Sequence, residues 1–394
     1  MLFTIIGISD SPQPHLNPDV LAEIKRGKVF SGGRRHHQIV ASLLPADAVW
    51  IDIVAPLDTV FEQYVGKEHI VVFASGDPLF YGFANTVRRM MPEAEIKLFP
   101  TFNSLQSLSH RLVLPYHDMR IVSLTGRPWH EFDRALIECA GKIGVLTDGT
   151  HTPDAIARRM IEYGYTDYIM HVGEQMGNPE CERVTTLSLE QSARRDFAQP
   201  NCLILAGSHR RRMGIPDNEF ALLDGRERMI TKMPIRLLAL QALGLVGCRR
   251  LWDIGFCTGS ISIEARLMFP HLHVTAFEVR PECKTLIETN ARRFGAPGID
   301  VHIGDFLEAN TKAIAKEEAP DAIFIGGHGG RLVEIMQRAT EVMADDACIV
   351  MNSVTPQSRQ LFDEACQKLQ LRADPPMRIS LNDYNPIEIL KCRR

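Results

Sequence analysis

Two acidic residues and a short glycine-containing turn could together bind a nucleoside. Asp253, Gly255 and Gly259 stand between an apolar run and a helix-like run, and Glu278 ends the next apolar run. Small residues let a backbone approach a ligand closely, and a carboxylate at the tip of the second strand can bond the hydroxyl groups of a ribose. The spacing therefore predicts a site for a nucleoside-type cofactor.

The composition of this turn separates two kinds of nucleoside cofactor. A dinucleotide site needs three glycines, so that a pyrophosphate can rest on the helix N-terminus. Here the turn reads G-F-C-T-G from Gly255 to Gly259, two residues after Asp253. A carboxylate at this point repels a pyrophosphate but can pair with a cationic amine. S-adenosylmethionine carries an amino group and a sulfonium, so it fits the turn better than NAD.

The pattern D-x-G-x-x-T-G resembles motif I of class I S-adenosylmethionine-dependent methyltransferases. Cys257 stands where that family usually has glycine, so the turn must tolerate a β-carbon. Two other interpretations stay open, because Asp253 could cap the following helix and Asp305 could be a plain turn residue. The resemblance implies cofactor contacts from Asp253, Gly255, Cys257, Thr258, Gly259, Glu278, Gly304 and Asp305.

Four glycines surround a histidine at Gly326–Gly330, directly after the apolar run 322–325. Class I methyltransferases commonly place substrate-facing groups here, so the resemblance implies that Gly327 and Gly329 let a large flat ligand approach. His328 could move protons near neutral pH and is the predicted catalytic residue, acting as a proton relay. Alternatively, the glycines only make a tight turn and His328 is solvated.

A second turn of this general kind lies in the N-terminal half. Residues 74–82 read A-S-G-D-P-L-F-Y-G after an apolar run, and Asp77 with Pro78 suits the start of a helix. This segment resembles the S-G-D-P-x-x-Y-G motif of the tetrapyrrole methylases, which bind S-adenosylmethionine between two α/β lobes. The resemblance implies a further cofactor site that involves Gly76, Asp77, Phe80 and Ser104.

The order of the two motif sets along the chain narrows the resemblance. Together with S-G-G-R-R-H at 31–36, it is similar to the bifunctional precorrin-6Y C5,15-methyltransferase (decarboxylating) family of corrin biosynthesis. The resemblance implies a tetrapyrrole (precorrin) substrate and one S-adenosylmethionine site in each domain. The N-terminal domain would methylate C5, and the C-terminal domain would methylate C15 and decarboxylate the C12 acetate. It also implies a cofactor contact from Thr231 and substrate anchors at Arg34, Arg35 and Arg331.

The pattern of strands and helices around these residues predicts an α/β fold in two parts. Residues 1–207 alternate strands and helices, which predicts a two-lobed tetrapyrrole methylase domain with a lobe boundary near 112–118. Residues 208–226 break the pattern and predict a linker, with a long internal loop as the alternative. Residues 227–394 predict a Rossmann-like class I methyltransferase sheet closed by an antiparallel strand pair around a loop at 382–386. The strands expected in the first part are Phe3–Ile8, Val49–Ile53, Ile70–Ala74, Ile96–Phe99, Met119–Ser123, Ile143–Leu146, Tyr168–Val172 and Cys202–Ala206.

Composition excludes several classes of protein. The 394 residues are 45% hydrophobic and 23% charged, as in globular proteins of two or three domains. No apolar run reaches the ~18 residues of a membrane span, and no signal peptide is recognisable. Nine cysteines without metal-ligand spacing predict reduced thiols, a cytoplasmic location and no metal site. The net charge of −4 argues against general nucleic-acid binding.

Three alternatives remain at this point. The same reaction could act on a cobalt-loaded precorrin, which the sequence does not distinguish from the metal-free compound. The chain could be an RNA methyltransferase with an accessory domain, although no N-P-P-Y-type motif follows the 322–325 run. It could also be a non-catalytic protein that binds S-adenosylmethionine, with Cys257 as a sign of decay. Related class I domains suggest a homo-oligomer.

Overall fold

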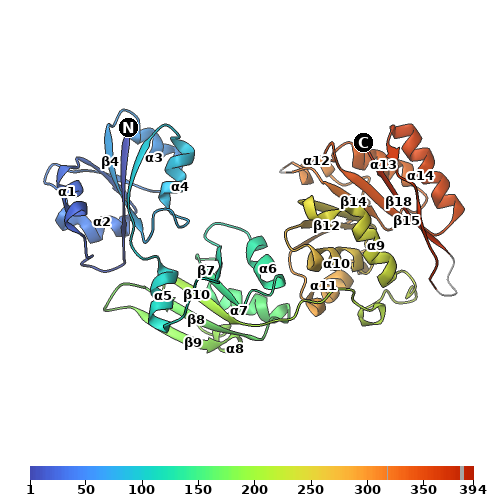
Figure 1. Ribbon diagram of the computed structural model, residues 1–394, viewed down its shortest axis with the longest axis horizontal. Helices are drawn as coiled ribbons and strands as arrows, with labels where there is room; N and C mark the ends of the chain where they lie inside the picture. Colours follow the sequence, from blue (N-terminus) through green and yellow to red (C-terminus); the bar gives the residue numbers. More distant parts are fainter. Residues whose placement is uncertain (317, 382–385) are drawn as a thin grey trace. The chain divides into compact units, whose positions relative to one another are not determined.

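The computed structural model describes residues 1–316, 318–381 and 386–394, so most of the predicted loop at 382–386 lies outside the described residues. The chain divides into two compact units, which are described separately (Figure 1). The first unit contains Met1–Arg127, Gly141–Arg158 and Asp167–Gly207, and the second contains Pro128–Ala140, Arg159–Thr166 and Ser208–Arg394. None of the described helices is long and apolar enough to cross a membrane.

The first unit begins with a parallel sheet in the order β3-β2-β4-β1-β5. Its strands are β1 (Leu2–Ile8), β2 (Val29–Gly32), β3 (Val49–Asp52), β4 (His69–Ser75) and β5 (Glu95–Phe99), and its helices are α1 (Pro18–Arg26), α2 (Arg34–Val40), α3 (Leu57–Tyr64) and α4 (Phe83–Met90). On β1, Phe3 and Ile5 join one buried cluster and Ile6 and Ile8 join another. Both faces of the sheet are therefore covered, as is usual for parallel strands.

A second sheet in this unit has the order β6-β7-β10-β8-β9 and is antiparallel except between β6 and β7. Its strands are β6 (Arg120–Ser123), β7 (Lys142–Leu146), β8 (Tyr168–Glu174), β9 (Arg183–Ser188) and β10 (Asn201–Gly207), with helices α5 (Ser104–Leu112), α7 (Pro153–Glu162) and α8 (Leu189–Ser192). Leu105 and Leu108 of α5 pack against Cys202 and Ile204 of this sheet. The chain therefore passes from the first sheet to the second before Ser104, N-terminal to the predicted boundary at 112–118.

An eight-stranded sheet forms the second unit, in the order β13-β12-β11-β14-β15-β18-β16 with β17 paired to β18. Its strands are β11 (Arg250–Ile254), β12 (His273–Glu278), β13 (Ile299–Ile303), β14 (Ala322–Ile325), β15 (Cys348–Ser353), β16 (Arg372–Ala373), β17 (Met377–Ile379) and β18 (Ile387–Arg393). The strands β11 to β15 are parallel, and β18 is antiparallel to its neighbours. The predicted antiparallel closing pair is confirmed by the β17–β18 pairing.

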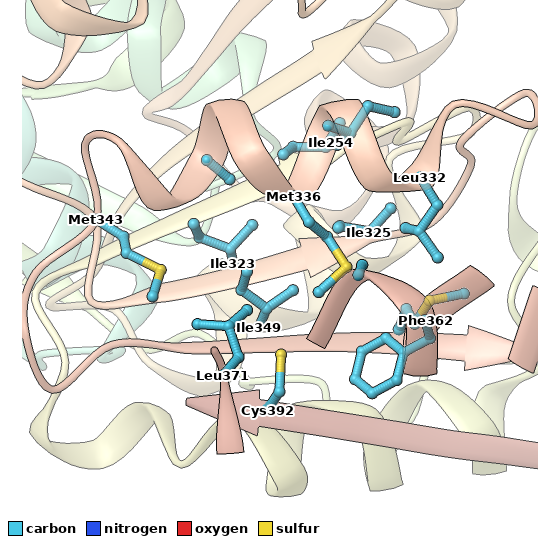
Figure 2. Packing of buried hydrophobic residues seen from close by; sticks show 14 of the residues in the cluster. Ile254, Ile323, Ile325, Leu332, Met336, Met343, Ile349, Phe362, Leu371 and Cys392 are labelled. Atoms are coloured by element: carbon cyan, nitrogen blue, oxygen red, sulfur yellow. The ribbon is translucent and has the colours of Figure 1, made fainter. Parts of the chain in front are cut away.

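Two apolar layers cover the faces of this sheet. Figure 2 shows the layer in which Ile254, Ile323 and Ile349 of the strands meet Met336 of α13 and Phe362 of α14. The opposite face packs against α9 and α10. The helices are α6 (His130–Ile137), α9 (Met233–Leu243), α10 (Ser260–Met268), α11 (Glu282–Phe294), α12 (Thr311–Ile314), α13 (Leu332–Thr340) and α14 (Pro356–Leu369).

Residues 208–226, predicted as a linker, are anchored to the second unit. Ile215 and Phe220 are buried in it. The buried carboxylate of Glu264 accepts hydrogen bonds from the backbone N–H groups of Gly214 and Ile215 and from the guanidinium of Arg236. Removing one partner of such a buried, hydrogen-bonded charge pair is costly. The segment is thus held beside α9 and α10, next to the predicted cofactor site.

Candidate active site

A cavity of about 790 Å³ opens in the second unit at the carboxyl ends of β11, β12, β14 and β15. Ligands of α/β sheets bind at this edge. Gly259 does not line the cavity. It precedes α10 with φ of 74°, and it packs so closely that a β-carbon on it would lie 2.3 Å from Ile287 Cγ1. The structure brings the other predicted residues of this region to the cavity wall: Thr231, Asp253, Gly255, Cys257, Thr258, Glu278, Gly304, Asp305, Gly327, His328, Gly329 and Arg331.

Asp253, next to the last residue of β11, is 0% exposed. Its Oδ2 accepts a hydrogen bond of 2.6 Å from Ser262 Oγ in the first turn of α10, while its Oδ1 has no partner among the described residues. Burial raises the pKa of Asp253 to about 7, and the bonds from Ser262 oppose that rise. The contact to α10 agrees with the capping interpretation, and the second oxygen still needs a partner, which a cationic amine would supply.

Glu278, at the end of β12, is held rigidly beside Asp253. Its Oε2 accepts a hydrogen bond of 3.0 Å from the backbone N–H of Cys257. Its Oε1 accepts bonds from the backbone N–H groups of Val279 and Arg280 and from the Arg280 guanidinium at 2.9 Å. A carboxylate oxygen with one bond can accept another. Oε2 is therefore free to bind a ribose hydroxyl in a fixed orientation.

The turn after β11 accommodates Cys257 in the left-handed region, at φ of 49°. This conformation costs an L-residue about 1–2 kcal/mol and explains why a glycine is usual here. Gly255 is more constrained, since a β-carbon on it would lie 2.6 Å from the backbone nitrogen of Gly327. The turn tolerates a β-carbon at Cys257, as expected, but has no room for one at Gly255.

Asp305 and Arg331 are occupied by protein partners. Asp305 Oδ1 accepts a hydrogen bond from the backbone N–H of Leu307, and its Oδ2 pairs with Arg331 at 2.7 Å. The Leu307 N–H and the Arg331 charge lower the pKa of Asp305. Arg331 also pairs with Glu334 at 3.1 Å. The geometry thus favours the turn interpretation for the Asp305 side chain, and two carboxylates already neutralise Arg331.

His328 is half-buried and held on both sides of its ring. Its Nδ1 accepts a hydrogen bond of 3.2 Å from the backbone N–H of Gly330, and its Nε2 lies 3.5 Å from Ser358 Oγ. Burial lowers the pKa of His328, so the ring is neutral near pH 7. Because Nδ1 accepts, the proton of the neutral ring lies on Nε2. The histidine therefore presents one N–H donor, and Ser358 on α14 is a contact that the sequence had not indicated.

The mouth of the cavity combines cationic and apolar side chains. Arg228, Lys232 and Arg280 line it, with Lys232 paired to Asp217 at 3.7 Å and Arg280 to Glu278 at 2.9 Å. So do Met229, which is 39% exposed, and Val354, which is 59% exposed. In the sequence, the concentration of charged residues from 224 to 232 is the pattern that indicates these side chains at the mouth of the cavity. Such a mouth suits a flat apolar molecule that carries carboxylates at its edge.

In the first unit, two strand ends meet at glycines. A β-carbon on Gly7, in β1, would lie 1.9 Å from the carbonyl oxygen of Gly76, which follows β4 and has φ of 64°. The N–H of Gly76 donates to the carbonyl of Ile8 at 2.9 Å. Gly7 lies within the first expected strand, Phe3–Ile8, and its need to be glycine follows from the pairing of β1 with β4.

The prediction that a helix starts at Asp77 and Pro78 is wrong, because α4 begins at Phe83. Asp77 Oδ1 accepts from the N–H of Leu79 at 2.9 Å and makes a local turn. Tyr81 then adopts φ of 54°, which a continuous helix does not permit.

Phe80 and Ser104 lie against the second sheet of this unit. Phe80 packs on the cluster that contains Leu105, and Ser104 is the first residue of α5. Asn103 caps that helix by accepting from the N–H of Gln106 at 2.9 Å.

Arg34 and Arg35 are exposed in the first turn of α2. Arg35 pairs with Asp10 at 3.0 Å and donates to Ser75 Oγ at 3.0 Å. His36 Nε2 lies 2.9 Å from the same hydroxyl, and burial together with the Arg35 charge lowers the pKa of His36 to about 4. A polar cluster thus stands at the ends of β1, β2 and β4. No group of three His, Cys, Asp or Glu in the described ranges could hold a metal ion.

Two family models match the chain, one in each half. The model described as Tetrapyrrole (Corrin/Porphyrin) Methylases matches residues 3–193. The model described as Precorrin methyltransferase domain matches residues 223–388. Both matches agree with the motifs from which the two resemblances were drawn.

Among curated relatives, a Sinorhizobium protein named precorrin-6Y C(5,15)-methyltransferase (decarboxylating) is 32% identical over 89% of this chain and 84% of the relative. Two relatives from Salmonella typhimurium match smaller shares of the chain. The cobalt-precorrin-6B C(15)-methyltransferase (decarboxylating) is 33% identical over 44% of this chain and 93% of its own length. The cobalt-precorrin-7 C(5)-methyltransferase is 27% identical over 46% of this chain and 89% of its own length.

Proposed function

This chain belongs to the precorrin-6Y C5,15-methyltransferase (decarboxylating) family of S-adenosylmethionine-dependent methyltransferases, and we propose that it carries out both methylations of cobalamin biosynthesis. The N-terminal half methylates a precorrin-6Y-type tetrapyrrole at C5. The C-terminal half methylates C15 and removes the C12 acetate as carbon dioxide. The division is supported by the two Salmonella proteins named for single reactions, each of which matches less than half of the chain.

The observation that carries the proposal is the unpaired oxygen of Asp253 in the C-terminal cavity. A buried carboxylate oxygen without a partner favours a bound cation. The amino group of S-adenosylmethionine would supply this cation, and Glu278 would bind its ribose. Asp253 and Glu278 lie near the carboxyl ends of the neighbouring strands β11 and β12. A cofactor held by both residues would leave the β14 and β15 side of the cavity for the tetrapyrrole.

The methyl transfer needs alignment more than activation. A meso carbon of the reduced macrocycle is enamine-like, so it forms a bond to the methyl carbon as the bond from methyl to sulfur breaks and S-adenosylhomocysteine leaves. Methylation at C15 leaves the conjugated system cationic. The electron pair of the bond between the acetate methylene and its carboxylate then flows into that cation as carbon dioxide departs. His328, with its proton on Nε2, is placed to relay a proton to the carbon that remains.

Several finer points belong to the proposal. Each half binds one S-adenosylmethionine, the N-terminal half through Gly76, Asp77, Phe80 and Ser104. The mouth cations of the C-terminal half and the Arg34–Arg35 pair bind the carboxylate arms. The protein works as a homo-oligomer, as related class I domains suggest. It acts in the cytoplasm, which the nine free cysteines support, and does not act on nucleic acid, which the net charge of −4 supports.

One incubation tests the reaction and its alternatives. The full chain is mixed with methyl-labelled S-adenosylmethionine and with either metal-free precorrin-6Y or its cobalt complex, and product masses are recorded. We expect two labelled methyl groups and the loss of carbon dioxide on the metal-free compound. Turnover of the cobalt complex alone would favour the cobalt-dependent reaction. Label in RNA but not in either tetrapyrrole, or binding without any transfer, would overturn the proposed function.

A further inference from the structure

Asn352, next to the last residue of β15, has a carboxamide that lines the C-terminal cavity. Its Oδ1 is buried and has no hydrogen-bond partner within the part of the chain that the structure describes. Leaving a buried acceptor unpaired costs roughly 1–3 kcal/mol. Natural proteins pair nearly all such groups, so an unpaired oxygen that faces a cavity indicates a ligand that donates to it.

The strand register places Asn352 away from the cofactor. Asp253 on β11 is level with Phe324 on β14, which is level with Val350 on β15. Asn352 therefore lies two strands across and two residues further on, about 12 Å from Asp253 between Cα atoms. Glu278 lies on β12, on the opposite side of β11. A cofactor that spans Asp253 and Glu278 extends away from Asn352, which leaves Asn352 to the substrate.

The surroundings of Asn352 restrict what it can bind. On its face of β15, Cys348 and Val350 join an apolar cluster with Ile389, the residue that pairs with Asn352 on β18. The cavity wall nearby adds Val354 and Ile387. An uncharged carboxamide in an apolar wall is a poor partner for a carboxylate arm, which the mouth arginines would bind better. It suits a neutral N–H group that enters with the apolar body of the substrate.

We propose that Asn352 accepts a hydrogen bond from a pyrrole-type N–H of the tetrapyrrole and thereby sets which meso carbon faces the sulfonium. This inference rests on the proposed function of the C-terminal half. Because the carboxylate arms repeat around the edge of the macrocycle, they alone do not fix its rotation in the cavity. The hydrogen bond to the carbonyl oxygen of Asn352 fixes it. Asn352 is then a determinant of methylation at C15 and does not contribute to cofactor binding.

The test compares Asn352→Leu with Ser353→Ala in the full chain. Leucine keeps nearly the shape of asparagine without its hydrogen-bonding atoms. Asn352 is half-buried, and the neighbouring Ser353 is buried, but the Ser353 Oγ bonds to the carbonyl of Thr355 at 3.0 Å and the residue does not line the cavity. We expect Asn352→Leu to lower kcat/KM for C15 methylation by roughly tenfold to hundredfold, whereas Ser353→Ala leaves it within about threefold. C5 methylation of the same molecules, S-adenosylhomocysteine affinity and the thermal midpoint of Asn352→Leu should not fall.

Each of the other possible results of this test leads to a single conclusion. If wild-type protein methylates C15 and Asn352→Leu does so with unchanged kcat/KM, the inference about Asn352 is wrong and the proposed function stands. If Asn352→Leu lowers the thermal midpoint or the affinity for S-adenosylhomocysteine, the side chain serves packing or the cofactor, and the inference is again overturned. If the wild-type protein transfers no methyl group to the tetrapyrrole, the proposed function itself fails.

Discussion

The two candidate sites share a backbone design and differ in their charges. In each unit two parallel strand ends meet at glycines, Gly7 with Gly76 in the first and Gly255 with Gly327 in the second. In the second unit the acid beside the turn, Asp253, is buried with one oxygen unpaired. In the first unit the acid of the turn, Asp77, is half-buried and bonds the N–H of Leu79.

The difference indicates that similar turns serve different recognition chemistry. Close strand-end packing lets a ligand reach the backbone in both units. At its turn the second unit adds two buried carboxylates, Asp253 and Glu278, that can pair with an ammonium and bond a ribose, whereas the acid of the first unit's turn, Asp77, is half-buried. We therefore expect cofactor binding in the second unit to depend on pH and charge, and binding in the first to depend on backbone shape.

The largest effect is expected from Gly7→Ala. Its β-carbon would lie 1.9 Å from the carbonyl oxygen of Gly76, so the end of β1 must move away from β4. Overpacking of this kind costs about 1–3 kcal/mol and displaces the turn. Calorimetry should show one equivalent of S-adenosylhomocysteine per chain where the wild type binds two, and the product should lack the C5 methyl group. The control is Gly149→Ala in the same unit, whose β-carbon meets no atom within 4 Å. Normal C5 methylation by Gly7→Ala would contradict backbone-dependent binding.

A loss confined to the second unit is expected from Asp253→Asn. Removing one partner of a buried charge pair costs about 2–5 kcal/mol, so affinity at that site should fall roughly a hundredfold. The equivalent bound by the first unit should keep its affinity. Calorimetry with S-adenosylhomocysteine resolves the two sites, and equal weakening at both would break the contrast between them.

The same carboxylate predicts a pH dependence. Burial raises the pKa of Asp253 to about 7 from an unfolded value near ~3.9. The folded apoprotein therefore holds this proton more tightly, and the stability it gains below ~pH 4 is lost as the pH rises to about 7. Above that range the cost is at most about 4 kcal/mol. Cofactor affinity runs the other way, since the ammonium pairs with the ionised carboxylate, and should rise from pH 6 to 8 at the second site only. Asp253→Asn should flatten both curves, and a pH-independent wild type would refute the assignment.

Features that depend on a short stretch of sequence could be predicted more completely than features that depend on contacts between distant residues. All eight strands expected in the first part are present, because short apolar runs of about four to six residues between turn signals identify strands. The short β2 and the half-exposed edge strand β9 lack that pattern and were missed. The helix α14 was also missed, although Thr355 and Pro356 give it a recognisable cap and first turn.

The cofactor residues of the second unit could be predicted because they sit in one turn and at one strand tip. Asn352 and Ser358 could not, since their roles depend on the register of β15 against β14 and on the position of α14. The Asp305–Arg331 pair shows the same limit. Both residues were placed in the site, and only the structure pairs them with each other.

An effect on the rate of one reaction, without a loss of cofactor affinity, is expected from His328→Gln. Glutamine can donate a hydrogen bond but cannot shuttle a proton, so C15 methylation with decarboxylation should slow roughly a hundredfold. C5 methylation should be unchanged, since it is assigned to the first unit and His328 lies in the second. Single-turnover product masses measure both. If decarboxylation keeps its rate, His328 serves only the turn through its bond from Gly330.

The smallest effect is expected from Cys257→Gly, which tests whether the second turn also depends on shape. Glycine removes the strain of a side chain at φ of 49°, which costs about 1–2 kcal/mol. Against this gain, glycine makes the unfolded chain more flexible, which costs roughly 0.5–1 kcal/mol, and it leaves the volume of the buried sulfur empty. These changes nearly cancel, so stability should move by less than about 1 kcal/mol and cofactor affinity by less than about threefold. Cys257→Val, with a branched side chain in the same conformation, should be clearly less stable. If Cys257→Gly instead lost the cofactor, the thiol would be a ligand contact. The family's usual glycine could then not substitute for it, and the two turns would differ in more than their carboxylates.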